Sequence, residues 1–304
     1  MNTDVDKSVC IARKAFAILD QTKIPGPDFN LEYFRAQQDY WSARRQNSDH
    51  NESRWQQLTK AARDKHEKSA GRLRAHLCTG EPIVLFLRSF ILTEQSGNLP
   101  SGSSLIWDRT PESTSHFYRS IHPHKSDKIM TELSSKVTLV GAASTIAGEF
   151  EMQSELGIFV PDIRLHLPSD GWFEIICRLI SVASKIIVRA AKINRGLAME
   201  MAALSAANRM NDTVIIIEEE SDHFPWNRML NWDEGEPLTK DHPLLASFPC
   251  VLSGADLSSK GIDGCPEIVR LLAQLKAISN EPLEGRLTKT ISSLESATIP
   301  AIDF

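Results

Sequence analysis

One acidic side chain stands alone in an apolar stretch of this sequence. The segment 195–208 reads RGLAMEMAALSAAN, and Glu200 is the single ionisable side chain between Leu197 and Ala207. A carboxylate on an apolar helix loses its hydration unless it is paired or kept neutral, and burial raises its pKa. Perturbed carboxyl groups gather at functional sites, so Glu200 is a candidate for catalysis if it lines a pocket.

Two structural roles would also account for Glu200. An acid in the first turn of a helix gains about 0.3–1 kcal/mol from the helix dipole. Alternatively, Glu200 could pair with Arg88, Arg189 or Arg195. Its position favours function, because it follows the apolar run 184–190 and a short turn and should therefore lie beside the carboxyl edge of a sheet.

Other motifs that carry chemistry are few. The sequence contains neither GxGxxG after a strand nor GxxxxGK[ST], so the usual phosphate-binding loops are missing, and it has no GxSxG nucleophile motif. His116, His122 and His124 lie in a polar segment, where we expect them to face solvent rather than to bind a metal. The acidic run 218–220 ends a predicted strand and is expected to be a solvated turn. We therefore expect no metal site.

The pattern of apolar segments after Gly80 predicts the strands and helices that position Glu200. Short apolar or alternating runs predict strands, and helical spacing predicts helices between them. This alternation indicates right-handed crossovers and a parallel sheet covered on both faces. We therefore predict a doubly wound α/β domain over 81–280, with a mostly parallel sheet of about five strands. The strand candidates are 82–90, 136–141, 162–168, 184–190, 212–220 and 248–252, and the helix candidates are 171–183, 196–210 and 265–279.

The two ends of the chain are predicted to lie outside this domain. Residues 1–80 are polar and helical in pattern, which suggests an N-terminal arm or assembly region, and the thin apolar stripe of its last helix includes Leu73 and Leu77. Residues 281–304 are interpreted as a C-terminal tail that could contain a short helix. Two long loops, 92–128 and 221–247, are expected to leave carboxyl ends of strands.

Composition narrows the class of protein. The 304 residues carry a net charge of −5, which argues against nucleic acid as the main ligand, since phosphate backbones attract clustered Lys and Arg. The five cysteines are widely spaced, and the sequence does not begin with a basic and then apolar signal segment, so we expect a cytoplasmic protein. Charges such as Arg88, Arg178 and Lys185 interrupt the apolar stretches, so we expect no membrane span.

Several segments together resemble a known family. The pieces VLFLRSF (84–90), VTLVG (137–141), 156–172 and 184–204 are similar, in order and spacing, to the bacterial TIR-like proteins with an LRS[FY] first strand. In TIR domains a helix that follows a strand and a turn carries a glutamate, and Glu200 occupies that place. The resemblance implies a TIR/flavodoxin-like α/β fold, cleavage of NAD, activation by assembly with copies of itself or with a defence-system partner, and a role in antiphage defence.

One carboxylate suffices for the implied reaction. Nicotinamide leaves NAD as a neutral molecule, so no general acid is needed, whereas an ordinary glycoside requires two carboxyl groups. Glu200 would hold ribose hydroxyl groups and stabilise the oxocarbenium-like centre, with NAD as substrate and no cofactor. Two alternatives stay open: deoxyribosyl transfer between nucleobases with Glu200 as covalent nucleophile, and a non-catalytic assembly or nucleotide-sensing module. The candidate substrate-binding residues are Arg88, Ser89, Phe90, Gly141, Trp172, Arg189 and Asn194.

The candidate substrate-binding residues also have structural interpretations. Arg88 and Ser89 follow the first predicted strand, where they could form a strand-end salt bridge and cap instead of contacting phosphate or ribose. Trp172 begins a predicted helix, where a tryptophan can be part of the core rather than a wall of the site.

Overall fold

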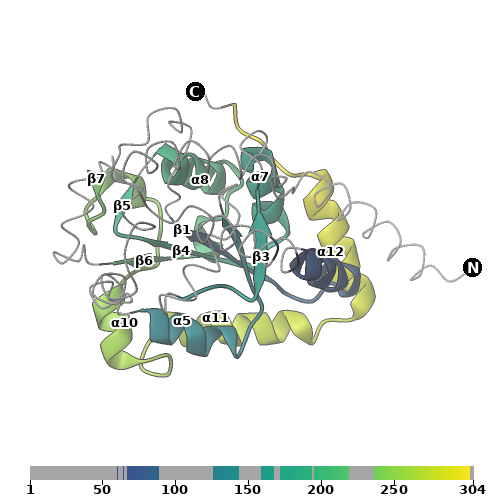
Figure 1. Cartoon of the computed structure of the whole chain (residues 1–304), viewed down its shortest axis with the longest axis horizontal. Helices are drawn as coiled ribbons and strands as arrows, with labels where there is room; N and C mark the ends of the chain where they lie inside the picture. Colours follow the sequence, from purple (N-terminus) through teal and green to yellow (C-terminus); the bar gives the residue numbers. More distant parts are fainter. Residues whose placement is uncertain are drawn as a thin grey trace, which may run out of the picture.

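Six apolar segments of the chain form one parallel sheet in the computed structural model (Figure 1). The structure describes Lys60, Asp64 and residues 67–88, 126–143, 159–167, 172–193, 195–218 and 236–301. Within these residues the sheet has the order β3-β2-β1-β4-β6-β8, so its six strands are close to the predicted number of about five. All six strand candidates are confirmed. The strands are β1 (Val84–Arg88), β2 (Leu139–Ala143), β3 (Ile163–His166), β4 (Lys185–Ala190), β6 (Thr213–Ile217) and β8 (Val251–Ser253).

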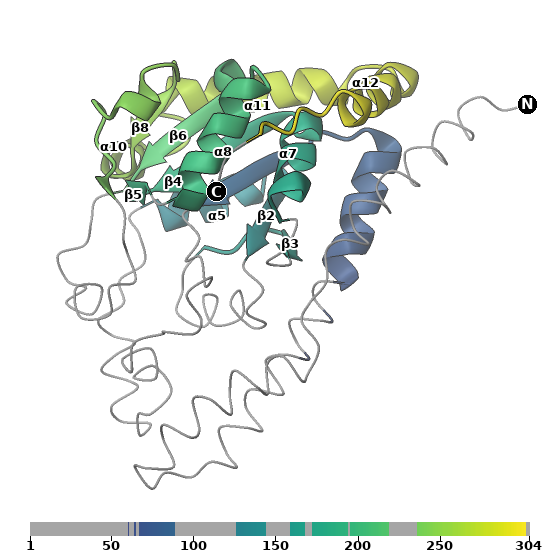
Figure 2. The same ribbon diagram turned by 90° about the horizontal axis from the view of Figure 1, so that it is seen from above.

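Helices cover both faces of the sheet, which confirms the doubly wound α/β architecture (Figures 1 and 2). The alternation of side chains along each strand separates two apolar cores. In β4, Ile186 and Val188 face one core and Ile187 faces the other. We name the two sides of the sheet after helices that cover them: Ile186 and Val188 lie on the α8 face, and Ile187 lies on the α5 face. The α8 face carries helix 67–79, α7 (Trp172–Val182), α8 (Arg195–Ala206) and α12 (Leu283–Glu295); the α5 face carries α5 (Asp127–Ser134), α10 (Gly254–Lys260) and α11 (Pro266–Ser279).

The predicted helices 171–183, 196–210 and 265–279 correspond to α7, α8 and α11, and they are confirmed. Helices α5 and α10 were not predicted. Both are short, with eight and seven residues, so each gives only a weak periodic signal in the sequence.

Helix 67–79 covers the β3 edge of the sheet. The Ser69 hydroxyl oxygen accepts the backbone N–H of Arg164 in β3 at 3.1 Å, and the Arg72 guanidinium donates to the Asp162 carbonyl at 2.9 Å. These bonds occupy an edge that could otherwise pair with another chain. Leu73 is buried, as the apolar stripe predicted, so this part of the N-terminal region belongs to the core. Apart from Lys60 and Asp64, the part of the predicted N-terminal region before residue 67 lies outside the described residues.

The segment interpreted as a tail also packs into the α/β core. Helix α12 packs against α7, and its Leu287 and Leu294 side chains are buried in the α8-face core. Gly80 permits this approach: its φ is +61°, and a Cβ there would lie 2.7 Å from the Cβ of Arg286. A glycine is therefore needed where helix 67–79 turns into β1.

Replacing Gly141 in β2 by Ala should lower the free energy of unfolding by about 1–3 kcal/mol. A Cβ at this position would overlap the ring of Pro161, so the strand or the Pro161 segment must shift. Urea denaturation of the variant and the parent measures the difference, with Gly285→Ala as control, because a Cβ at 285 meets nothing within 4 Å. Equal stability of Gly141→Ala and the parent would contradict this packing.

Candidate functional site

The winding of the sheet reverses between β1 and β4. These strands are neighbours, with Arg88 opposite Arg189 in register. The next described helix after β1 is α5, whereas β4 leads to α8 on the opposite face. In open α/β sheets such a switch point leaves a crevice outside the carboxyl ends of the two strands, and ligands bind there. Residues beside the β1 and β4 ends are therefore the first candidates for a site.

Glu200 lies in the second turn of α8, near this switch point, and is completely buried. Its exposed fraction is 0%, and neither carboxyl oxygen has a hydrogen-bond partner within the described part of the chain. Leu197 and Leu204, one helical turn away on either side, are buried in the α8-face core. Burial raises the pKa of Glu200 well above its usual value of 4.5, so the neutral carboxyl form is favoured.

The structure supports neither the first-turn interpretation of Glu200 nor its pairing with Arg88 or Arg189, and the side chain of Arg195 lies outside the described part of the structure. Helix α8 has no acid in its first turn, so the helix dipole gives Glu200 little stabilisation. The Arg189 guanidinium pairs with Asp127 on the α5 face, and no hydrogen bond to Glu200 is made by any described arginine. A buried polar group without a partner costs about 1–3 kcal/mol, so Glu200 is destabilising where it stands.

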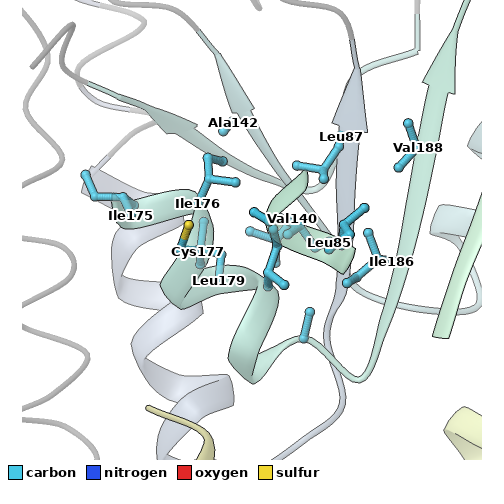
Figure 3. Packing of buried hydrophobic residues seen from close by; sticks show 14 of the residues in the cluster. Leu85, Leu87, Val140, Ala142, Ile175, Ile176, Cys177, Leu179, Ile186 and Val188 are labelled. Atoms are coloured by element: carbon cyan, nitrogen blue, oxygen red, sulfur yellow. The ribbon is translucent and has the colours of Figure 1, made fainter. Parts of the chain in front are cut away.

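A buried thiol lies within electrostatic range of Glu200. Cys177 is part of α7, which packs against α8, and Figure 3 shows it among apolar side chains of the sheet. Burial first, and then the carboxyl groups of Glu174 and Glu200, raise the pKa of Cys177 to about 11. The thiol is therefore neutral at neutral pH.

The burial of Glu200 makes stability depend on pH. The unfolded chain releases the Glu200 proton near pH 4.5, whereas the folded chain holds it to higher pH. The free energy of unfolding should therefore fall as pH rises from 4.5 to the folded pKa, by up to about 1.4 kcal/mol per pH unit. Urea denaturation of the parent and Glu200→Gln between pH 5 and pH 8 measures this component. Parallel curves for the two proteins would contradict it.

A second buried polar group lies on the α5 face at the same edge. We call Ser126, Asp127, Arg189 and Glu218 the rim cluster. The Arg189 guanidinium forms an ion pair with Asp127, and it also donates to the Ser126 hydroxyl at 3.4 Å. The Ser126 hydroxyl in turn donates to the Glu218 carboxylate. All four residues are buried, so the cluster ties the start of α5 to β4 and to the end of β6.

Aromatic and backbone contacts complete the rim cluster. The Arg189 guanidinium carbon lies 5.3 Å from the centre of the Phe86 ring, within the range of a cation–π interaction. A Cβ at Gly254, where α10 begins, would overlap the Glu218 carboxylate. The expectation that the run 218–220 is a solvated turn is therefore wrong for Glu218, because Ser126 and Gly254 enclose it; residues 219 and 220 lie outside the described part.

The predicted site residues divide between the two faces. Trp172 begins α7 and packs, half-buried, on the core that contains Glu200. Arg88 alternates with Leu87 and so belongs to the α5 face with Arg189. Gly141 lies against Pro161, which fills the space beside it. Ser89, Phe90 and Asn194 lie outside the described residues, as do His116, His122 and His124.

Ser126 and Asp127 were not among the predicted site residues, because they lie in the segment 92–128, for which the sequence indicates a long loop. A signal was present, since Ser-Asp followed by Ile129, Met130 and Leu133 has the composition of a helix start with an apolar face. Their pairing with Arg189 and Glu218 had no sequence signal, because it joins residues more than 60 positions apart.

Comparisons with known proteins assign the chain to no family. The chain matches no family model, no curated protein and no solved structure. Among the described residues, no group of three His, Cys, Asp or Glu side chains could hold a metal ion. None of the described helices has the length and apolar character that crossing a membrane requires.

Proposed function

We propose that this protein cleaves the N-glycosidic bond between nicotinamide and ribose in NAD, with Glu200 as the catalytic carboxyl group. One observation carries the proposal: a completely buried glutamate without a hydrogen-bond partner in the described residues lies in α8, the helix that follows β4 beside the switch point. Such a group lowers the stability of the fold, so its presence needs a reason other than stability, and a catalytic role is one such reason.

The sheet order supports the TIR/flavodoxin-like part of the proposal. Without β3, the order β2-β1-β4-β6-β8 corresponds to 2-1-3-4-5 in the numbering of a five-stranded doubly wound sheet. That order is typical of flavodoxin-like domains, which bind their nucleotide at the corresponding switch point. In this interpretation β3 is an additional edge strand next to β2.

The chemistry assigns one task to Glu200. The bond from ribose C1′ to the nicotinamide nitrogen breaks, and its electron pair leaves with neutral nicotinamide. Water then adds to C1′ and loses a proton, which gives ADP-ribose. A carboxylate beside the ring stabilises the positive charge that develops at C1′. The buried, neutral Glu200 is therefore the resting form, and catalysis requires a conformation that admits NAD and ionises the acid. We propose that assembly with further copies or with a partner in bacterial antiphage defence provides it.

Incubation of the concentrated full-length protein with NAD tests the proposal. Product identification by chromatography and mass spectrometry should find nicotinamide together with free or cyclised ADP-ribose, at a rate that rises more steeply than protein concentration. A second arm supplies a deoxynucleoside and a different free base, and base exchange there would instead support deoxyribosyl transfer. No nicotinamide at any protein concentration would contradict the proposal.

The sealed position of Glu200 also favours the second candidate, a non-catalytic assembly or nucleotide-sensing module. In that case Glu200→Ala would change only the melting temperature, and the assembled protein would consume no nucleotide. Melting temperature and NAD consumption, measured on the same samples, separate the two candidates.

A further inference from the structure

The connection between β4 and α8 is bonded by a segment that returns from far along the chain. Residues Lys192–Ile193 form β5, which pairs in an antiparallel manner with β7 (Glu236–Pro237). The next residue, Leu238, donates its N–H to the Ala191 carbonyl at 2.8 Å. Three consecutive residues after β4 are thus held by residues 236–238.

This pairing lies directly before the helix that carries Glu200. Only residue 194 separates β5 from α8. The side chains of Ile193 and Leu238 are buried in the same core as Leu197 and Met199 of α8. Residues 236–238 therefore hold the start of α8 in the arrangement in which Glu200 is sealed.

We infer that residues 236–238 are a releasable strap that holds α8 in the position in which Glu200 is buried. This inference rests on the proposed function and adds how the site opens. The attachment is short, since each strand of the pair has two residues and Pro237 has no N–H to donate. Isolated two-stranded pairs are marginal, and proteins open locally where few bonds hold a segment. The strap can therefore detach while the six-stranded sheet stays intact.

The register of β5 and β7 allows the strap to be locked. Ala191 and Leu238 form a hydrogen-bonded pair, so the adjacent pair Lys192 and Pro237 is the non-hydrogen-bonded one. The Cα atoms of such a pair lie about 4.5 Å apart, within the range that a disulfide spans. The double variant Lys192→Cys/Pro237→Cys should therefore close a disulfide across the strap.

Alkylation of Cys177 by N-ethylmaleimide reports opening without reference to activity. Cys177 is buried in α7, in the same core as Leu197 and Met199 of α8, and tryptic peptide 165–178 contains no other cysteine, so mass spectrometry measures its labelling alone. We expect the oxidised double variant to label about tenfold more slowly than its reduced form. The single variants Lys192→Cys and Pro237→Cys are the controls, and neither should respond to reduction. Equal labelling in the oxidised and reduced forms would overturn the inference.

A second pair of variants tests the same strap by weakening it. Leu238→Ser should speed the labelling of Cys177, whereas Leu245→Ser removes a buried leucine of the same core outside the strap. The comparison is made after global stability has been measured by urea denaturation. If both variants label at the rate set by their global stability, the strap has no special role.

NAD cleavage separates failure of the strap from failure of the proposed function. If the parent releases nicotinamide, the oxidised double variant should release none, and reduction of its disulfide should restore release. If the parent never cleaves NAD, the proposed function fails while the Cys177 rates still decide on the strap. If the parent and the oxidised double variant cleave NAD equally fast, the proposed role of the strap is refuted and the proposed function stands.

Discussion

Replacing Arg189 by Met is expected to lower the free energy of unfolding by about 3–5 kcal/mol, as removal of one partner of a buried ion pair does. The side chains of Arg189 and Asp127 are only 5% and 6% exposed, so water screens their interaction little. Methionine retains an apolar stem against Phe86 but leaves the buried carboxylates of Asp127 and Glu218 without the cation that now pairs with Asp127. The cost therefore comes from uncompensated charge rather than from a cavity.

Urea denaturation at neutral pH measures this loss. Arg178→Met is the matched control, because Arg178 pairs with Glu174 on the surface of α7, where such pairs contribute about 0.3–0.5 kcal/mol. Adding Asp127→Asn to Arg189→Met should restore part of the stability, since it removes one of the stranded charges. A loss no larger for Arg189→Met than for Arg178→Met would show that the rim cluster does not hold β4, β6 and α5 together.

The strands could be predicted from the sequence because each is a short apolar run between polar segments. Burial on both faces of a parallel sheet requires such runs, and 84–88, 185–190 and 213–217 all have this pattern. Their order in the sheet follows from long-range pairing and had no local signal. For the same reason the sequence indicates a tail over 281–304, whereas Leu287 and Leu294 of α12 pack into the core.

The candidate site was predictable only in its central residue. The apolar surroundings of Glu200 are visible in the sequence, and the structure buries it completely. The division of Arg88, Arg189 and Trp172 between two faces depends on strand alternation at the sheet edge. The burial of Glu218 depends on Ser126, which is 92 positions away in the chain, so no local pattern could indicate it.

Substitution of Glu200 by Gln should reduce nicotinamide release from NAD by about 100-fold or more, as loss of a transition-state electrostatic partner does. Glutamine retains the shape of the side chain but cannot ionise, so it cannot stabilise the positive charge at ribose C1′. Because the amide carries no proton that titrates in this range, the variant should remain folded at neutral pH. Glu174→Gln is the matched control, since Glu174 is a surface acid on the adjacent helix α7.

The decisive measurement is the initial rate of nicotinamide release by the parent, Glu200→Gln and Glu174→Gln at equal, high protein concentration. We expect release by the parent and by Glu174→Gln, and loss of release in Glu200→Gln. Equal rates in all three proteins would contradict the assignment of Glu200 as the catalytic group.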